Sequence, residues 1–157
     1  GVEFMVTSTS PASVSVVIPA YCSGSVVEAV RSVSDLSPES VVVVDSSPEE
    51  PPQLNSEVKR IWSPDRMNPA TARNRGAELV RSDYILFLDS DVVLTDEAQR
   101  FVRQFLVEPD RELVAGVYRT DRSRNNDRGT GASAGPWPGS GCQYAGYHDI
   151  VIDPHDQ

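Results

Sequence analysis

Three short runs of apolar residues recur along the chain, and helical patterns separate them. Their sequences are VSVVI at 14–18, VVVV at 41–44 and YILFL at 84–88. None of the runs alternates with polar residues as a half-exposed strand would, which predicts strands buried on both faces. Such strands need helices on both sides. The pattern therefore predicts an α/β chain with a doubly wound, mostly parallel sheet and helices on both faces.

Residues with capping chemistry predict where the helices between the runs begin. Asn68 followed by Pro69 is typical of a helix start, and we expect this helix to run to about Arg81. Thr95 predicts the cap of a later helix, and residues 25–33 carry valines at helical spacing. The residues expected to pack the Asn68 helix against the sheet are Ala72, Gly76, Leu79 and Val80.

Further apolar segments predict outer strands and a division of the chain into three parts. The expected strands are VKRIW (58–62), LVAGVY (113–118) and, at an edge, DIVID (149–153). The three parts are a flexible lead-in at 1–12, an α/β domain at 13–118 and a glycine-rich segment at 119–157. We expect the last part to be a flexible tail or the remnant of another region.

Polar residues follow the apolar runs, at the edge where a parallel sheet binds its ligands. Asp45 ends the second run, and Asp89 and Asp91 follow the third, separated by Ser90. Two such carboxylates repel each other, and a hard divalent cation such as Mg²⁺ or Mn²⁺ relieves that repulsion. The pattern predicts a metal site that bridges the phosphates of a nucleotide. The alternative is a turn in which the carboxylates only cap backbone amides.

The net charge limits which binding partners the chain can have, and the cysteines indicate its cellular compartment. The 23 acidic residues outnumber the 14 basic ones and give a net charge of −9, which excludes nucleic acid and anionic membranes as partners of the whole surface. No apolar run approaches the ~18 residues of a transmembrane segment. Cys22 and Cys142 lie far apart without a CxxC motif, which argues against a zinc site and fits a reduced, cytoplasmic location.

Three segments together resemble a known family. The segments VSVVIPAY (14–21), VVVVDSS (41–47) and ATARNRGAELVRSDYILFLDSDV (70–92) resemble the nucleotide-binding half of family 2 glycosyltransferases. The resemblance implies a Rossmann-like GT-A fold, truncated at its C-terminal side. It also implies transfer of a sugar from a nucleotide diphosphate sugar to an acceptor, with a divalent metal, Mn²⁺ or Mg²⁺, as cofactor.

The resemblance also implies roles for individual residues. Asp91 would be the principal metal ligand, and Asp89 would contact the metal or the ribose. Arg73 would face the nucleotide, with a surface pair to Glu78 or Asp83 as the alternative. The resemblance does not assign a catalytic base. Asp149 and Asp153 are candidates for that role, and His148 and His155 are further candidates for metal ligands. The other substrate-binding residues that the resemblance implies are Pro19, Ala20, Tyr21, Asp45 and Ser90.

Two alternative functions remain open from the sequence. Few residues follow Tyr118, so the chain could be a catalytically incomplete nucleotide-binding fragment, or a subunit that needs a partner chain or a missing C-terminal region. LFLDSDVV also fits a haloacid dehalogenase-like phosphatase. That class needs a lysine downstream of the motif, and the only lysine, Lys59, lies upstream.

Overall fold

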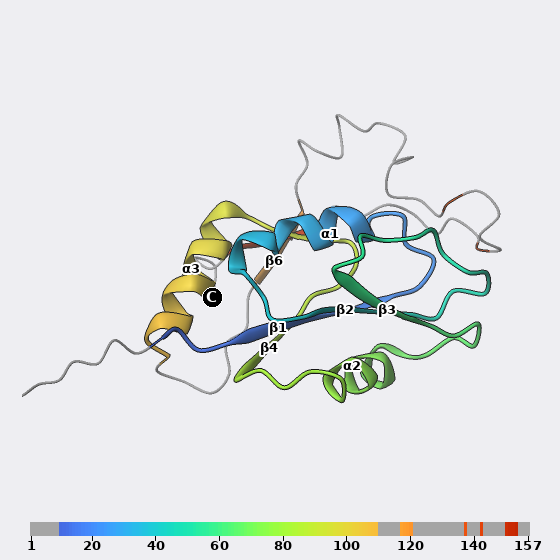
Figure 1. The fold of residues 1–157 in the computed structure, drawn as a ribbon. Coiled ribbons are helices and arrows are strands. Elements are labelled where there is room, and N and C mark those ends of the chain that lie inside the picture. The colour runs from blue at the N-terminus through green and yellow to red at the C-terminus, as the bar shows by residue number, and fades with distance from the viewer. Residues whose placement is uncertain (1–9, 110–116, 121–136, 138–141, 143–149, 154–157) are drawn as a thin grey trace, which may run out of the picture.

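A computed structural model describes residues 10–109, 117–120, 137, 142 and 150–153. Its main sheet has four parallel strands in the order β3-β2-β1-β4 (Figure 1). The order confirms the doubly wound, mostly parallel α/β fold, because successive strands are added on opposite sides of β1. The strands are β1 (Val14–Ala20), β2 (Val41–Asp45), β3 (Val58–Trp62) and β4 (Tyr84–Phe87).

Helices cover both faces of this sheet, as expected for strands that are apolar throughout. Figure 1 shows α1 and α3 on one face and α2 on the other. The larger core lies on the α1 and α3 face and includes Val16, Ile18 and Leu88, whereas Val42, Val44 and Ala72 form a smaller core beneath α2. The helices are α1 (Val26–Ser32), α2 (Pro69–Ala77), α3 (Asp96–Val107) and the 3₁₀ turn η1 (Ser34–Leu36).

Both predicted helix caps are confirmed, but α2 ends earlier than expected. The side chain of Asn68 accepts a hydrogen bond from Thr71 N–H at 2.8 Å, and Thr95 accepts one from Ala98 N–H at 3.0 Å. The prediction that α2 reaches Arg81 was wrong. After Ala77 the backbone bonds change to an i→i−3 pattern, which tightens the last turn. Leu79 is consequently 41% exposed and does not face the sheet.

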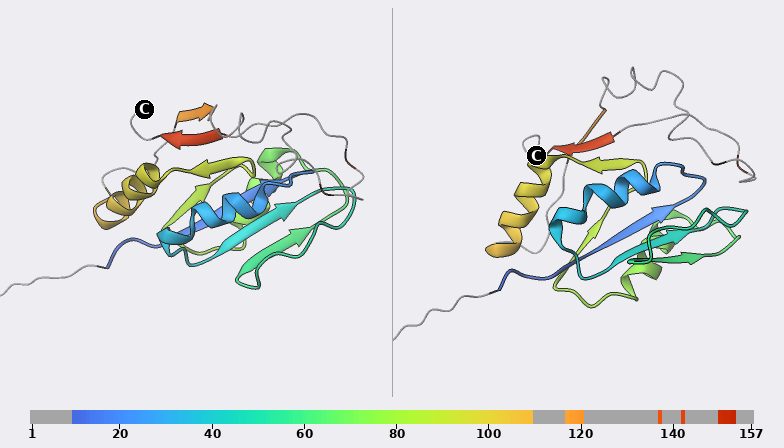
Figure 2. Two further views of the ribbon diagram at one scale, coloured as in Figure 1. Left: turned by 90° about the horizontal axis from the view of Figure 1, so that it is seen from above. Right: turned by 45° about the horizontal axis from the view of Figure 1, so that its top comes forward.

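A second, three-stranded sheet has the order β5-β7-β6 (Figure 2). β7 (Ile150–Asp153) pairs parallel with β5 (Val92–Leu94) and antiparallel with β6 (Val117–Thr120). The expectation of an edge strand at 149–153 was wrong in position, because β7 is the central strand. Of the strand expected at 113–118, residues 113–116 lie outside the described residues.

Among the described residues, no helix is both long enough and apolar enough to span a membrane.

Candidate functional site

The carboxyl edge of the main sheet brings together the residues that follow β1, β2 and β4. The register sets Ala20 of β1 beside Asp45 of β2, and Asp45 beside Trp62 of β3. The helices that follow β1 and precede β4 lie on opposite faces, so the edge between these two strands is the switch point where doubly wound sheets bind ligands.

The rim of this edge is formed by the last two residues of β1, Pro19 and Ala20, and by Tyr21, which follows them. Pro19 is half-buried, and Tyr21 is 40% exposed. Ala20 is buried, and its carbonyl accepts a hydrogen bond from Ser46 N–H at 3.0 Å, which fixes the end of the strand. The guanidinium of Arg66 stacks on the Tyr21 ring, 4.3 Å from its centroid, in a cation–π contact. Arg66 could not be identified as a site residue from the sequence, because no local signal marks this loop residue.

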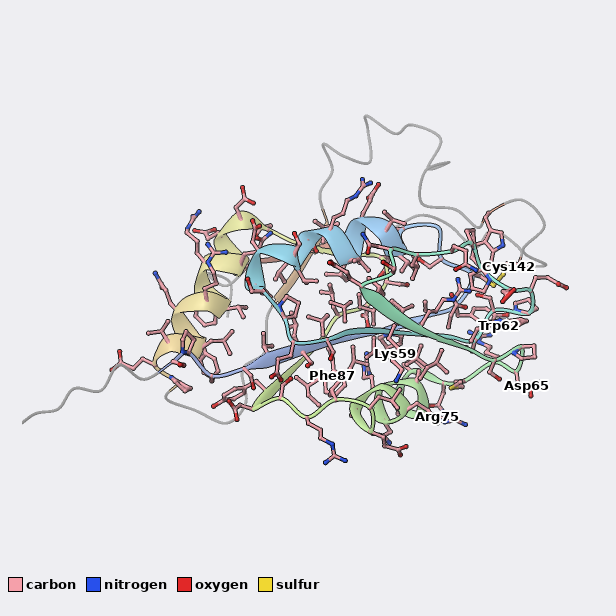
Figure 3. The ribbon with its side chains drawn as sticks, viewed as in Figure 1. Lys59, Trp62, Asp65, Arg75, Phe87 and Cys142 are labelled. Carbon is pink, nitrogen blue, oxygen red and sulfur yellow. A yellow bond between two sulfur atoms is a disulfide. The ribbon has the colours of Figure 1, made fainter. Side chains whose placement is uncertain are left out.

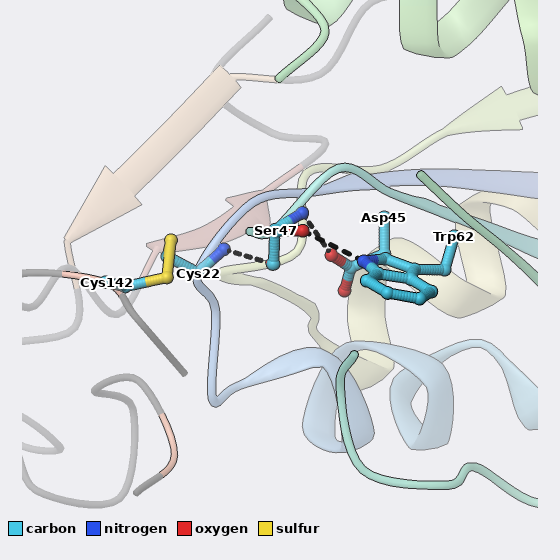
Figure 4. Close-up of a disulfide and its surroundings, with 5 residues drawn as sticks. All are labelled: Cys22, Asp45, Ser47, Trp62 and Cys142. Carbon is cyan, nitrogen blue, oxygen red and sulfur yellow. Dashed lines mark hydrogen bonds between the residues drawn. A yellow bond between two sulfur atoms is a disulfide. The ribbon is translucent and has the colours of Figure 1, made fainter. Parts of the chain in front are cut away.

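Asp45 is held in a polar network at the end of β2 (Figure 4). Its side chain is 2% exposed, and its carboxylate Oδ1 accepts a hydrogen bond from Ser47 N–H at 2.9 Å. Ser47 Oγ accepts from Cys22 N–H at 2.8 Å, and the Ser47 carbonyl accepts from Trp62 Nε1 at 2.9 Å. Burial raises the pKa of Asp45, while the hydrogen bonds from Ser47 and the charge of Arg60 oppose that rise.

The raised pKa predicts that Asp45→Asn stabilises the folded protein at neutral pH. The folded chain keeps the Asp45 proton to higher pH than the unfolded chain, whose carboxyl ionises near 3.8. Ionisation of Asp45 therefore lowers the free energy of unfolding as the pH rises above about 4. The asparagine side chain has no charge to desolvate, and its amide oxygen can accept the hydrogen bond that Ser47 N–H donates to Asp45.

Thermal unfolding of wild type and Asp45→Asn across this pH range measures the effect. We expect the melting temperature of the variant to exceed that of wild type at pH 7, and the difference to shrink toward pH 4. Asp65→Asn, which removes an exposed carboxylate from the loop after β3, is the matched control. Parallel pH profiles for all three proteins would contradict the expectation.

Arg73 and Asp89 form an ion pair across the switch point. Arg73 Nη2, from α2, lies 3.1 Å from Asp89 Oδ1, which follows β4, and their side chains are 38% and 41% exposed. The alternative pairing of Arg73 with Asp83 is wrong, because the structure pairs Arg73 with Asp89 and Asp83 accepts a hydrogen bond from Ser13 N–H at 2.9 Å. A half-exposed ion pair at this edge leaves both groups accessible to a charged ligand.

The segment from Asp89 to Asp91 forms a turn that leads into β5. The Asp89 carbonyl accepts a hydrogen bond from Val92 N–H at 3.1 Å, and the Ser90 carbonyl accepts one from Ser25 Oγ at 2.8 Å. Both carboxylates are partly exposed. The described part of the chain holds no group of three or more His, Cys, Asp or Glu side chains that could bind a metal. Two carboxylates nevertheless fit Mg²⁺, which takes one or two of them together with phosphate oxygens and water.

A cavity of about 120 Å³ lies beside Asp45. One wall comes from α1 and the turn before it, and another from the loop 51–54. Arg60, which also lines the cavity, donates from Nη1 to the Pro51 carbonyl at 2.9 Å and to the Pro52 carbonyl. Trp137 lines it from the C-terminal part of the chain. Arg60 and Trp137 were not predicted as site residues from the sequence.

The two cysteines form a disulfide, which corrects the expectation that they are isolated. Cys22 and Cys142 have Cα atoms 5.7 Å apart and are separated by 120 residues in sequence. Figure 3 shows Cys142 and Trp62 near the same end of the sheet. A stable disulfide is typical of oxidising environments, so the cysteines do not support a reduced compartment.

Comparison with known families gives one match. The family model described as "Glycosyl transferase family 2" matches residues 15–150, which is most of the chain and reaches as far as β7. No curated protein matches the chain. The match favours the family suggested by the three sequence segments over the haloacid dehalogenase alternative.

Proposed function

Because the chain belongs to glycosyl transferase family 2, we propose that it binds a nucleotide diphosphate sugar at the carboxyl edge of its main sheet and transfers the sugar to an acceptor. The ion pair between Arg73 and Asp89 at the switch point is the observation that carries this proposal. In a chain with a net charge of −9, a diphosphate needs local positive charge, and Arg73 supplies it at this edge.

The nucleoside part of the donor would occupy the β1 and β2 side of this edge. Asp45 is an acceptor-only group when ionised, so its carboxylate suits N–H or O–H donors of a base or ribose. Tyr21 offers a half-exposed aromatic ring to a base, and Pro19 and Ala20 shape the rim next to it. These residues and the adjoining Ser90 form our proposed donor site.

A divalent metal would be held by Asp91 and Asp89. Members of this family commonly use such metals. When bound, Mg²⁺ or Mn²⁺ supplies positive charge that stabilises a departing diphosphate. The ion pair with Arg73 holds Asp89 at the switch point, and the Oδ1 atom of Asp89 is directed toward α2.

In the transfer itself, the bond between the anomeric carbon and the diphosphate oxygen breaks, and the diphosphate keeps the electron pair. An acceptor hydroxyl oxygen forms the new bond and gives up its proton to a base that we leave unassigned. We propose that residues 13–118 form the main part of the donor site and that 119–157 include a remnant of the acceptor region. His148, Asp149 and His155 lie outside the described residues.

Thermal unfolding with a panel of nucleotides tests the proposal. The panel contains UDP, GDP and their sugar conjugates, each with Mn²⁺, Mg²⁺ or a chelator. A nucleotide at 100 times its dissociation constant stabilises the folded state by about 2.7 kcal/mol. For a domain of this size, the melting temperature should rise by about 5–10 °C.

We expect one nucleotide to give a metal-dependent shift and the chelator to abolish it. The metal alone and the nucleotide with chelator are the controls. The absence of a shift with every nucleotide, from well-folded protein, would contradict the proposed donor site.

A further inference from the structure

Cys22 links the rim of the proposed donor site to the C-terminal part of the chain. It directly follows Tyr21, and its disulfide partner Cys142 lies far along the sequence. The Cys22 backbone has φ 55°, a left-handed conformation that fixes its turn, and its N–H donates to Ser47. Because Ser47 N–H donates to Asp45, the disulfide is connected to the Asp45 carboxylate through two successive hydrogen bonds (Figure 4).

The same disulfide constrains where Trp137 can lie. Trp137 precedes Cys142 by five residues, and five extended residues span at most about 17 Å. Trp137 lines the cavity that Asp45 also lines. Its indole is therefore tethered to the rim on which Cys22 and Tyr21 lie.

The two sides of this cavity are held in different ways. Hydrogen bonds from Arg60 to the Pro51 and Pro52 carbonyls fix the loop wall to β3. The Trp137 wall has a covalent link through Cys142. A cross-link between distant residues reduces the conformational freedom of the segment it closes. A cavity wall that is already ordered loses less conformational entropy when a ligand binds.

We propose that Trp137 is a donor-binding residue, and that the disulfide between Cys22 and Cys142 positions it at the Asp45 cavity to contact the planar base of a nucleoside diphosphate. The inference rests on the proposed function. An indole offers a large apolar face for a base, beside a carboxylate that accepts hydrogen bonds. The oxidised protein consequently binds the nucleotide more tightly than the reduced protein.

Isothermal titration of UDP and GDP in Mg²⁺ tests the contact with Trp137. Trp137→Ala should raise the dissociation constant roughly tenfold, in the range for loss of one aromatic stacking contact. Trp137→Phe keeps a ring and should recover most of the affinity. Because the chain has two tryptophans, quenching of wild-type fluorescence by nucleotide that disappears in Trp137→Phe would assign the contact to this ring.

A double-mutant cycle tests whether the disulfide affects nucleotide binding through Trp137. Cys142→Ser should weaken binding roughly fivefold, and Cys22→Ser should match it. Reduction of wild type by a phosphine should have the same effect: the S–S bond is cleaved to two thiols, and the phosphine takes oxygen from water to become a phosphine oxide. The phosphine should not change Cys142→Ser, and Trp137→Ala/Cys142→Ser should bind no more weakly than Trp137→Ala, because the disulfide acts through Trp137.

The outcomes separate the inference from the proposed function. If wild type binds no nucleotide, both are overturned. If wild type binds and Trp137→Ala binds equally well, only the inference is overturned. Additive losses from Trp137→Ala and Cys142→Ser would likewise overturn the positioning role, because the disulfide would then act independently of the ring. If Cys142→Ser does not fold, titrations of Trp137→Ala and Trp137→Phe in the oxidised state decide the matter.

Discussion

Replacement of Gly76 by leucine is expected to lower the stability of the folded protein by about 3 kcal/mol or more. Gly76 is buried on the face of α2 that contacts β1. A Cβ atom there would overlap Val17 Cγ1 and lie 3.2 Å from Val17 Cγ2. Val17 is fully buried in the central strand, so neither the helix nor the strand can move away without disturbing the sheet.

Denaturant unfolding of wild type, Gly76→Leu and Asn74→Leu measures this effect. Asn74→Leu is the matched control, because it adds the same side chain to an exposed position of the same helix. We expect Asn74→Leu to unfold within about 0.5 kcal/mol of wild type. Equal midpoints for Gly76→Leu and Asn74→Leu would show that α2 does not pack on β1 at this residue.

The main sheet could be predicted because its determinants are local. Runs such as VVVV at 41–44 are apolar on both faces, and this pattern alone requires covering helices on both sides. The starts of α2 and α3 were predictable for the same reason, since Asn68 and Thr95 satisfy backbone amides within their own first turns.

The strand order of the second sheet could not be predicted, because the pairing of its strands is non-local. β5 has only three residues and becomes a strand through its pairing with β7, which is distant in sequence. The central position of β7 likewise depends on partners on both sides rather than on its own sequence. The early end of α2 also has no strong local signal, because neither glycine nor proline follows Ala77.

The candidate site was predictable only in part. Asp45, Asp89 and Asp91 follow apolar runs, and the parallel topology sets such positions along one edge. The other residues of the candidate site are brought together by tertiary contacts. Cysteine spacing does not reveal connectivity, so the disulfide and the position of Trp137 could not be anticipated. The contact of Arg66 with Tyr21 joins two loops and likewise has no sequence signature.

The expected result for Asp91→Asn is loss of metal-dependent nucleotide binding with the fold preserved. We propose Asp91 as the principal metal ligand, and an amide oxygen is a weaker ligand for Mg²⁺ or Mn²⁺ than a carboxylate. Changes near a metal commonly cost 10- to 100-fold in affinity, so we expect a weakening of at least about tenfold. At the same nucleotide concentration a tenfold weakening leaves about 1.4 kcal/mol of stabilisation, so the metal-dependent thermal shift should fall from about 5–10 °C to about half that value or less.

The stability of the unliganded variant separates this role from a structural one. Removal of one of two neighbouring carboxylates relieves repulsion, so the melting temperature of Asp91→Asn without ligand should equal or exceed that of wild type. Asp35→Asn removes an exposed carboxylate in η1, at the opposite end of the sheet, and should leave both nucleotide binding and stability unchanged. A metal-dependent affinity in Asp91→Asn equal to that of Asp35→Asn would exclude Asp91 as a ligand. Loss of stability together with binding would instead assign Asp91 to the turn that leads into β5, and the diphosphate would then depend on the charge of Arg73.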